Sequence, residues 1–135
     1  MRRSIVATAL AVAGLAGGTL FAVAPAASAS GQACATKSLS TAYRAHGSTV
    51  NKSGSSGCSD LNLTYSNDST SNLGDSYAGF YRNSSGSWIR GSRGYVWADD
   101  GSHSPWIVLL SDVSSGTPMG VGSYYDGGDS VTVAH

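Results

Sequence analysis

The sequence predicts an all-β protein, a small single-domain β-sandwich or barrel of about seven short strands with one disulfide. Three observations lead to this fold class. Short apolar segments alternate with polar residues at a period of two, which is typical of half-buried strands. Ser and Gly supply 38 of the 106 residues from 30 to 135, which indicates many turns. Two cysteines, Cys34 and Cys58, lie in this same part of the chain.

Residues 1–29 have the three parts of a secretory signal peptide. Arg2 and Arg3 form the charged start, an Ala- and Val-rich apolar stretch follows, and Ala27-Ser28-Ala29 is a small-residue cleavage signal. The glycines within the apolar stretch argue against a membrane anchor. The sequence therefore predicts a cleaved leader at 1–29, a secreted domain at 30–135, and no membrane span after cleavage.

Cys34 and Cys58 are the only cysteines, so a single pairing is available to them. An oxidising compartment favours a disulfide between them. No second cysteine or histidine lies at zinc-ligand spacing, and the C-x-x-C pattern of redox proteins is absent. We therefore predict a structural disulfide and assign no metal site to these residues.

The strands are predicted from short periodic segments. Residues 37–46 form the one stretch that suits a short helix, and residues 47–57 are rich in turn residues and predict a loop. After that loop, Leu61, Leu63 and Tyr65 alternate with polar residues and predict a strand. The continuous apolar run at 106–110 predicts a central strand. The remaining strands are expected at 77–82, 87–90, 93–98, 119–125 and 130–133.

The core is expected to be thin and rich in aromatic residues. Only 16 of residues 30–135 are Leu, Ile, Val or Phe, whereas the chain contains seven Tyr and three Trp. A low aliphatic content raises the question of disorder, but disorder also requires a high net charge. The leader carries two of the eight Lys and Arg residues and none of the eight Asp, so the rest of the chain has a net charge of only −2.

Residues 76–98 are predicted to form a three-stranded meander with two chemically different faces. A type II′ turn at Gly91-Ser92 would pair Arg90 with Arg93 and Trp88 with Tyr95. The pleat then places aromatic and cationic side chains on one face. Flat rings suit stacking on sugars or anchoring a protein partner, and paired arginines could hold an anion. The candidate ligand-binding residues are Tyr81, Trp88, Tyr95, Trp97, Arg90 and Arg93.

The alternative for this meander is that the aromatic row forms the core. A chain this poor in aliphatic residues must bury some of its rings, and both arginines lie near a hairpin end, where they could reach solvent. Exposure of Trp88 distinguishes the two arrangements. The sequence leaves this choice open, and it also leaves the oligomeric state undetermined.

These features predict a secreted, non-enzymatic binding or surface protein whose partner is an extracellular glycan or protein. The weakly negative charge argues against a nucleic-acid partner. One alternative is an inhibitor of an extracellular hydrolase, with loops at 99–105 and 114–119 as candidate binding segments. A second alternative is a small hydrolase that uses Asp99, Asp100 and His103. No catalytic residues are assigned.

No cofactor is predicted, with calcium as the alternative. Residues 67–72 and 99–104 each resemble the calcium-binding loop of βγ-crystallins, with Asn72 and His103 as the departures. Oxygen-rich loops of this kind suit Ca²⁺. The triplets Gly74-Asp75-Ser76 and Gly128-Asp129-Ser130 resemble the nucleophile motif of chymotrypsin-like proteases. Both lack the glycine that follows the serine, and the chain is too short for that fold.

Overall fold

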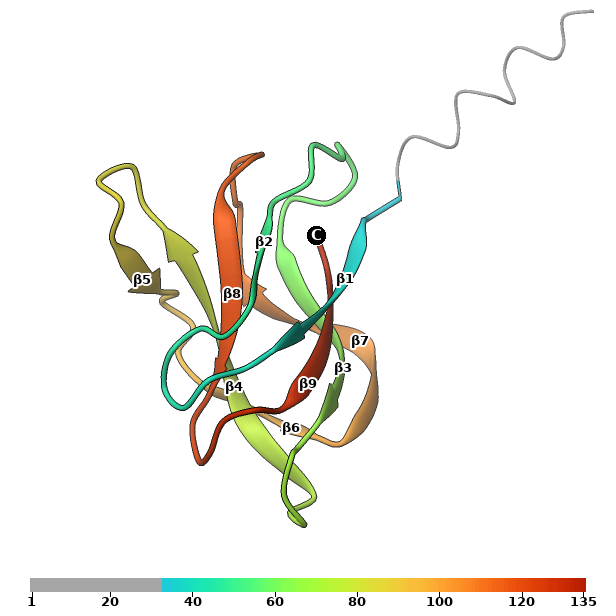
Figure 1. The fold of residues 1–135 in the computed structure, drawn as a ribbon. Helices are drawn as coiled ribbons and strands as arrows, with labels where there is room; N and C mark the ends of the chain where they lie inside the picture. Colours follow the sequence, from blue (N-terminus) through green and yellow to red (C-terminus); the bar gives the residue numbers. More distant parts are fainter. Residues whose placement is uncertain (1–32) are drawn as a thin grey trace, which may run out of the picture. The chain divides into compact units, whose positions relative to one another are not determined.

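The computed structural model of the protein describes residues 33–135, which form nine β-strands (Figure 1). The predicted leader, its cleavage site and the first residues of the predicted domain lie outside the described residues. No helix in the described part is long and apolar enough to cross a membrane. The strands are β1 (Thr36–Ser40), β2 (Thr49–Asn51), β3 (Leu61–Asn67), β4 (Gly74–Arg82), β5 (Trp88–Arg90), β6 (Val96–Asp99), β7 (Gly101–Leu110), β8 (Pro118–Ser123) and β9 (Ser130–Ala134).

The strands form two antiparallel sheets. One sheet has the order β1-β9-β3-β7. The other has the order β2-β8-β4-β5, and β6 also pairs with β4. The predicted all-β fold is therefore confirmed, as a sandwich of two separate sheets and not as a closed barrel. The two strands beyond the predicted seven are β1 and β2.

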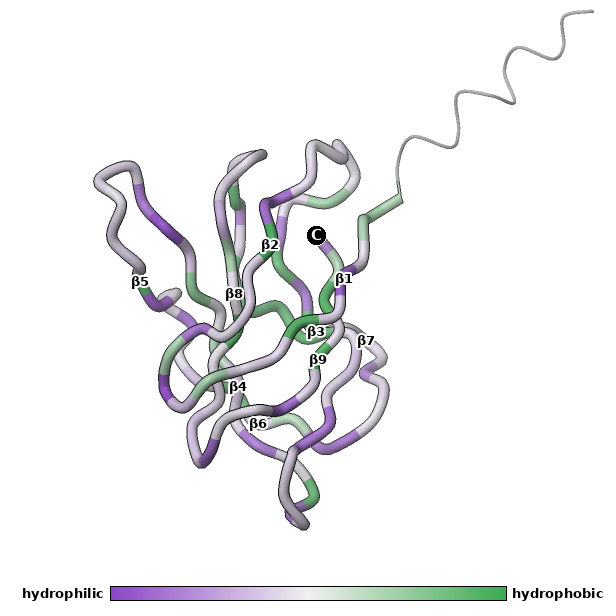
Figure 2. The backbone as a smooth tube through the Cα atoms, in the orientation of Figure 1, coloured by the Kyte–Doolittle hydropathy of each residue, from purple (hydrophilic) through white to green (hydrophobic). Residues whose placement is uncertain are grey.

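The space between the sheets is filled mainly by aliphatic side chains, which contradicts the expected aromatic-rich core. Tyr77 is the largest fully buried side chain, whereas Tyr43, Trp97, Trp106 and Tyr125 are exposed. Figure 2 shows the hydrophobic stretches gathered on the strands in the middle of the domain. Most of these aliphatic side chains come from β3, β7, β8 and β9. The main members of the core are Leu39, Leu61, Leu63, Tyr77, Leu109, Leu110, Met119, Val121, Val131 and Val133.

One local prediction at the start of the domain was wrong and another was wrong in part. The predicted helix at 37–46 begins instead within β1, which pairs along its whole length with β9, and continues through isolated β-bridges and a turn. The predicted loop at 47–57 is interrupted by the short strand β2, which pairs with β8. In both segments the hydrogen bonds to a neighbouring strand override the local preference, as is usual for short segments whose intrinsic propensity is weak.

The strand predicted as central, at 106–110, is part of the longer edge strand β7, which pairs only with β3. The loop predicted at 99–105 is mostly the first half of that strand. Only Asp100 lies between β6 and β7, and a cis peptide bond joins Ser104 to Pro105. The first of the two candidate inhibitory segments is therefore mostly strand and not a free loop.

The predicted meander was wrong in its pairing. β5 and β6 do not pair with each other, because both lie against β4 at different positions along it. The observed pairs are Tyr81 with Ile89 and Tyr77 with Val96. The Gly91–Gly94 turn therefore connects two consecutive strands on one side of β4, and it does not form a hairpin.

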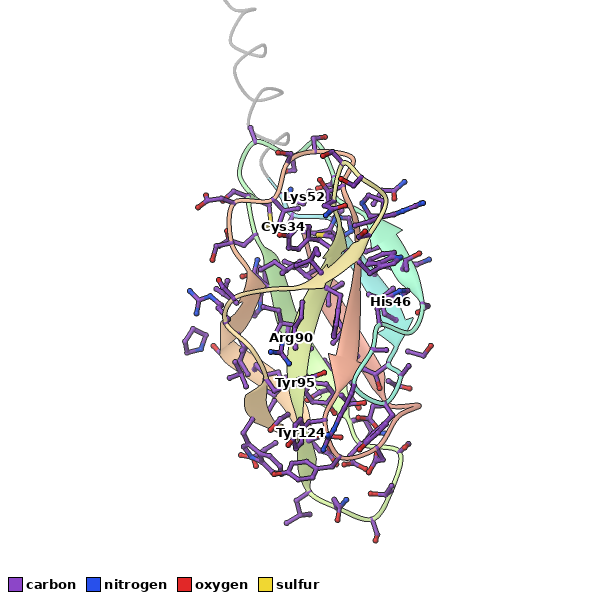
Figure 3. All side chains as sticks on the ribbon, turned by 90° about the vertical axis from the view of Figure 1, so that its left-hand side faces the viewer. Cys34, His46, Lys52, Arg90, Tyr95 and Tyr124 are labelled. Atoms are coloured by element: carbon purple, nitrogen blue, oxygen red, sulfur yellow. A yellow bond between two sulfur atoms is a disulfide. The ribbon has the colours of Figure 1, made fainter. Side chains whose placement is uncertain are left out.

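The predicted disulfide is confirmed: Cys34 and Cys58 are bonded. It joins the residues just before β1 to the loop that precedes β3. Lys52 lies close by, nearly fully buried, and its ammonium group donates to the carbonyl oxygens of Ser53 and Cys58. Figure 3 shows Cys34 and Lys52 at the same end of the domain.

The His135 side chain packs into this end of the domain. Its Nδ1 atom accepts a hydrogen bond from the backbone N–H of Ser53 at 2.9 Å. Burial, with a further contribution from the charge of Lys52, lowers the pKa of the imidazole. The neutral form is therefore the one that the folded state prefers.

We expect acid to destabilise the protein through His135. Below its ordinary pKa of about 6.5 the imidazole is protonated in the unfolded chain, whereas the native state resists protonation. Its contribution to stability is complete above that pH and is lost as the pH falls toward the lowered native value. His135→Asn keeps an acceptor for Ser53 without a titrating ring. Thermal unfolding between pH 7.5 and 5 should show a smaller loss in the variant than in the wild type, and equal losses would contradict this assignment.

Candidate functional site

A continuous group of aromatic and cationic side chains covers one end of the β4-containing sheet. The Tyr124 ring contacts those of Tyr95 and Tyr125 edge-to-face, with centroids 5.2 and 5.0 Å apart. Trp97 contacts Tyr125 at 6.5 Å. Figure 3 shows Arg90, Tyr95 and Tyr124 following one another along this side of the molecule. We call this group the aromatic patch: Tyr43, Arg44, Arg90, Tyr95, Trp97, Tyr124 and Tyr125.

Polar contacts fix the rings of the aromatic patch in place. The indole Nε1 of Trp97 donates to Oδ1 of Asp99 at 2.9 Å. The Arg44 guanidinium lies 4.1 Å from the centre of the Tyr124 ring and donates from Nε to the Tyr124 carbonyl oxygen at 3.2 Å. Arg90 lies 5.2 Å from the centre of the Tyr95 ring. Such cation–π contacts and hydrogen bonds reduce the conformational entropy that a ligand would have to remove.

Trp97 and Tyr125 border a shallow groove of about 540 Å³, lined also by residues 71–73 of the β3–β4 loop and by Gly74 at the start of β4. Trp97 is 50% exposed and Tyr125 is 62% exposed. Leu73, at the edge of the groove, is the most exposed large hydrophobic residue among those described. The groove therefore offers two ring surfaces to a ligand.

The structure brings three of the six predicted ligand-binding residues together. Tyr95, Trp97 and Arg90 belong to the aromatic patch. Trp88 instead lies against His46, with ring centroids 3.8 Å apart, and is partly buried.

The other two residues lie away from the patch. Tyr81 packs against the core, and Tyr77, on the same face of β4, is fully buried in it. The alternative that placed the aromatic face in the core therefore holds for Tyr77, and only in part for Tyr81, which is partly buried. Arg93 lines a separate hollow of about 790 Å³ between β5 and the end of β7, together with Tyr81 and Arg90.

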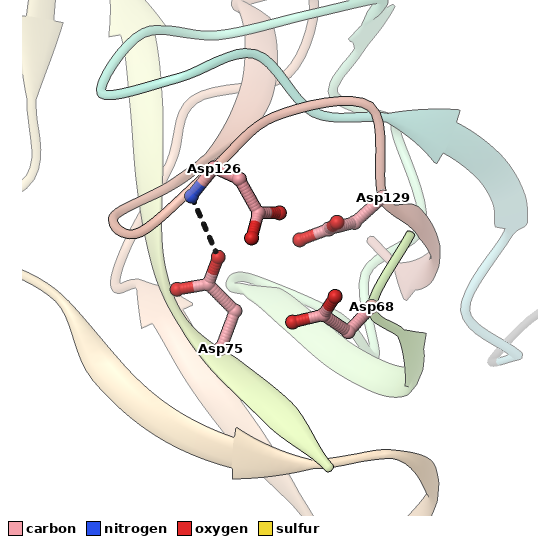
Figure 4. A group of neighbouring side chains, drawn as sticks. All are labelled: Asp68, Asp75, Asp126 and Asp129. Carbon is pink, nitrogen blue, oxygen red and sulfur yellow. Dashed lines mark hydrogen bonds between the residues drawn. The ribbon is translucent and has the colours of Figure 1, made fainter. Parts of the chain in front are cut away.

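Figure 4 shows a cluster of four aspartates that come from two loops and from the start of β4. Asp68 follows β3, Asp75 is the second residue of β4, and Asp126 and Asp129 belong to the β8–β9 loop. One carboxylate oxygen from each lies within 4.8 Å of those of the other three. Three of the four residues are buried, and Asp126 is partly buried. We call this group the aspartate cluster.

Asp75 connects the aspartate cluster to the aromatic patch. Its carboxylate accepts hydrogen bonds from the backbone N–H groups of Tyr124, Tyr125 and Asp126, at 3.1–3.3 Å. Asp68 and Asp129 also accept hydrogen bonds from the backbone of the β3–β4 loop. Asp68 accepts the N–H of Thr70 at 2.6 Å, and Asp129 accepts the N–H of Ser69 at 2.9 Å. The cluster therefore fixes both loops that border the groove.

Several oxygens of the cluster have no partner. Asp68 Oδ2, Asp126 Oδ1, Asp129 Oδ2 and the Tyr77 hydroxyl are buried without a hydrogen bond. Within residues 33–135, none of the four carboxylates forms an ion pair with Lys, Arg or His. Buried charges without a partner are strongly unfavourable.

The pKa values of Asp126 and Tyr77 reflect this crowding. Burial, followed by the charges of Asp68, Asp129 and Asp75, raises the pKa of Asp126. Burial, followed by the charge of Asp129, also raises the pKa of Tyr77, so its hydroxyl stays neutral. The surroundings of Asp126 therefore disfavour its negative charge.

Asp99, Asp100 and His103, considered above for a hydrolase, each have a separate partner. Asp99 accepts from Trp97, and Asp100 accepts the backbone N–H of Asp68 at 2.7 Å. The His103 ring hydrogen-bonds Ser66 Oγ at 2.9 Å. Asp99 and Asp100 therefore support the aromatic patch and the aspartate cluster.

Comparison with known proteins gives no match: no protein-family model, no curated protein and no solved structure matches this chain.

Sequence reasoning missed the aspartate cluster because its members come from three separate segments. Of its four residues, only Asp68 lies in a segment that the sequence indicated for calcium. Asp75 and Asp129 stand in the two Gly-Asp-Ser triplets, which were considered only as protease motifs. The available signal was the glycine that precedes Asp75 and the one that precedes Asp129, each near the start of a strand. A carboxylate at such a position can accept backbone N–H groups of an adjoining loop.

Proposed function

We propose that this protein is a secreted, non-enzymatic binding protein that attaches to an extracellular polysaccharide through the aromatic patch. The observation that supports the proposal is the exposure of Trp97 and Tyr125, whose rings contact each other and both line one groove. Pyranose rings present apolar C–H faces that stack on flat aromatic surfaces, while their hydroxyls need polar neighbours. Ser71 and Asn72 supply such neighbours along the groove.

A polysaccharide suits the patch better than a protein partner. The patch is formed of rings and guanidinium groups, and Leu73 is its one exposed aliphatic neighbour in the groove. A stable protein interface buries about 800 Å² on each partner and has an apolar centre. The shallow groove with its two exposed rings fits a linear chain of sugars more closely. Secretion, which the leader sequence predicts, would bring the protein to such polymers.

We expect Trp97→Ala to weaken retention on a polysaccharide at least tenfold. A central exposed ring can contribute about 1.4 kcal/mol or more to the binding free energy, which corresponds to that factor. The purified, oxidised protein would be mixed with insoluble cell wall, chitin and cellulose. The protein remaining in the supernatant would then be measured. Tyr125→Ala should have a similar effect.

Trp106→Ala is the matched control. Trp106 is 47% exposed, nearly as much as Trp97, but it lies on β7 in the other sheet and outside the patch. Its loss should leave retention unchanged, and circular dichroism would verify the fold of each variant. Retention on none of the polymers, or equal losses with Trp97→Ala and Trp106→Ala, would contradict the proposal.

A further inference from the structure

The aspartate cluster offers several carboxylate oxygens to one point, as a cation site does. It lacks the hydrogen-bond donors that would satisfy these oxygens if the cluster had a purely structural role. Its four carboxylates come from two loops and β4, and three of them carry a buried oxygen that accepts no hydrogen bond. A structural network would satisfy these oxygens. Oxygens left free and directed at one point are those that a bound ion can use (Figure 4).

The Tyr77 hydroxyl is an independent sign of a missing partner. Tyr77 belongs to the core, is fully buried, and its hydroxyl forms no hydrogen bond. Tyr77 lies two residues after Asp75 on β4, and Asp129 is close enough to this hydroxyl to raise its pKa, although the geometry between them does not complete a hydrogen bond. A buried phenol without a hydrogen bond is unfavourable, so a bound group that interacts with this hydroxyl would stabilise the site.

We propose that Asp68, Asp75, Asp126 and Asp129 bind one Ca²⁺ ion, which ties the β3–β4 loop, β4 and the β8–β9 loop together. All-oxygen ligands are those that Ca²⁺ prefers. With bonds of about 2.3–2.6 Å, ligands on opposite sides of the ion stand about 4.6–5.2 Å apart. The 4.8 Å spread of the four oxygens fits inside such a shell.

Calcium fits better than the other common cations. Zinc sites in proteins use mainly Cys and His, and the cluster contains neither. Magnesium requires near-ideal octahedral geometry at about 2.0–2.1 Å and usually keeps several waters. Four protein carboxylates around one buried point match the larger and more flexible shell of calcium. Two carboxylates would balance its charge, and the Asp75 charge is already stabilised by the N–H groups of the Tyr124–Asp126 backbone.

The site is tested by calcium titration of the purified, oxidised protein, with no polysaccharide present. Calorimetry with CaCl₂ should give one binding event per chain. At calcium about a hundredfold above Kd, linkage predicts a rise in Tm of roughly 10 °C over the protein in EDTA. MgCl₂ at the same concentration should give a much smaller rise.

Asp126→Asn separates loss of binding from loss of folding. The Asp126 carboxylate oxygen Oδ1 has no hydrogen bond to lose, and the amide removes one repelling charge. In EDTA this variant should therefore melt at or above the wild-type Tm, while its response to calcium should disappear. Asp112→Asn is the control, because Asp112 is exposed, lies outside the cluster and has a positive φ of 52° that asparagine tolerates.

Three results would overturn the assignment. One is a Tm that does not change between EDTA and millimolar CaCl₂, which would mean that the carboxylates share protons instead. Another is a full calcium response in Asp126→Asn, which would place the ion elsewhere. A response to Mg²⁺ without one to Ca²⁺ would refute calcium as the occupant. None of these readouts depends on polysaccharide binding.

Discussion

Replacing Asp75 with alanine is expected to lower the free energy of unfolding by about 3 kcal/mol or more. Asp75 is fully buried, and its carboxylate accepts the backbone N–H groups of Ser76, Tyr124, Tyr125 and Asp126. Alanine would leave these donors without their charged acceptor. Chemical denaturation, analysed by linear extrapolation, measures the loss.

The same substitution also removes a repelling charge, so the direction of the effect depends on which contribution is larger. Among the three carboxylates that raise the pKa of Asp126, Asp75 contributes least. The hydrogen bonds, in contrast, hold three consecutive residues of the β8–β9 loop. The lost hydrogen bonds therefore outweigh the relieved repulsion, and the variant is less stable.

Asp126→Asn provides the comparison. It removes the same charge from the cluster but no backbone hydrogen bond, and in EDTA it should not destabilise the protein. If Asp75→Ala were as stable as Asp126→Asn, the anchoring role of Asp75 would be wrong. Because Asp75 holds Tyr124 and Tyr125, its loss should also weaken polysaccharide retention at temperatures where the variant is still folded.

Removal of the disulfide is the second change with a large expected effect. In Cys34→Ser/Cys58→Ser the free energy of unfolding should fall by about 3–4 kcal/mol, which is the loop-entropy value for residues 24 positions apart. For a domain of this size the Tm should fall by about 15 °C or more. The double substitution leaves no free thiol that could form other disulfides.

The position of the disulfide specifies where the loss should appear. Cys34 precedes β1, an edge strand that pairs only with β9. Without the covalent link, β1 is expected to be the first strand whose amides exchange with solvent. Hydrogen exchange would detect this change. A loss below about 1 kcal/mol would show that the link constrains the unfolded chain far less than the loop model requires.

Part of the fold could be predicted because its signal is local. The alternation of Leu61, Leu63 and Tyr65 with polar residues depends on neighbouring positions alone, and it correctly located β3. Turn residues separated most of the later strands in the same way. Two cysteines admit one pairing, so the Cys34–Cys58 link needed no structure to be inferred.

The pairing of the strands could not be obtained in this way. Gly91-Ser92 has the composition of a hairpin turn, but β5 and β6 find their hydrogen bonds along β4 instead. The choice depends on which edge of which strand is free once the sheets assemble. For the same reason the rings of Trp88, Tyr95 and Trp97, expected on one face, were divided between His46 and the aromatic patch.

The sequence by itself determined the fold class, the disulfide and the supply of aromatic side chains, but not that most of the rings would lie outside the core. Only the tertiary structure decided which rings gather and which carboxylates meet. Asp68 and Asp129 are 61 positions apart, yet their oxygens lie within one cluster because β3 and β9 are neighbours in the same sheet. Sheet topology fixes such contacts through long-range hydrogen bonding, and residue spacing along the chain does not record it.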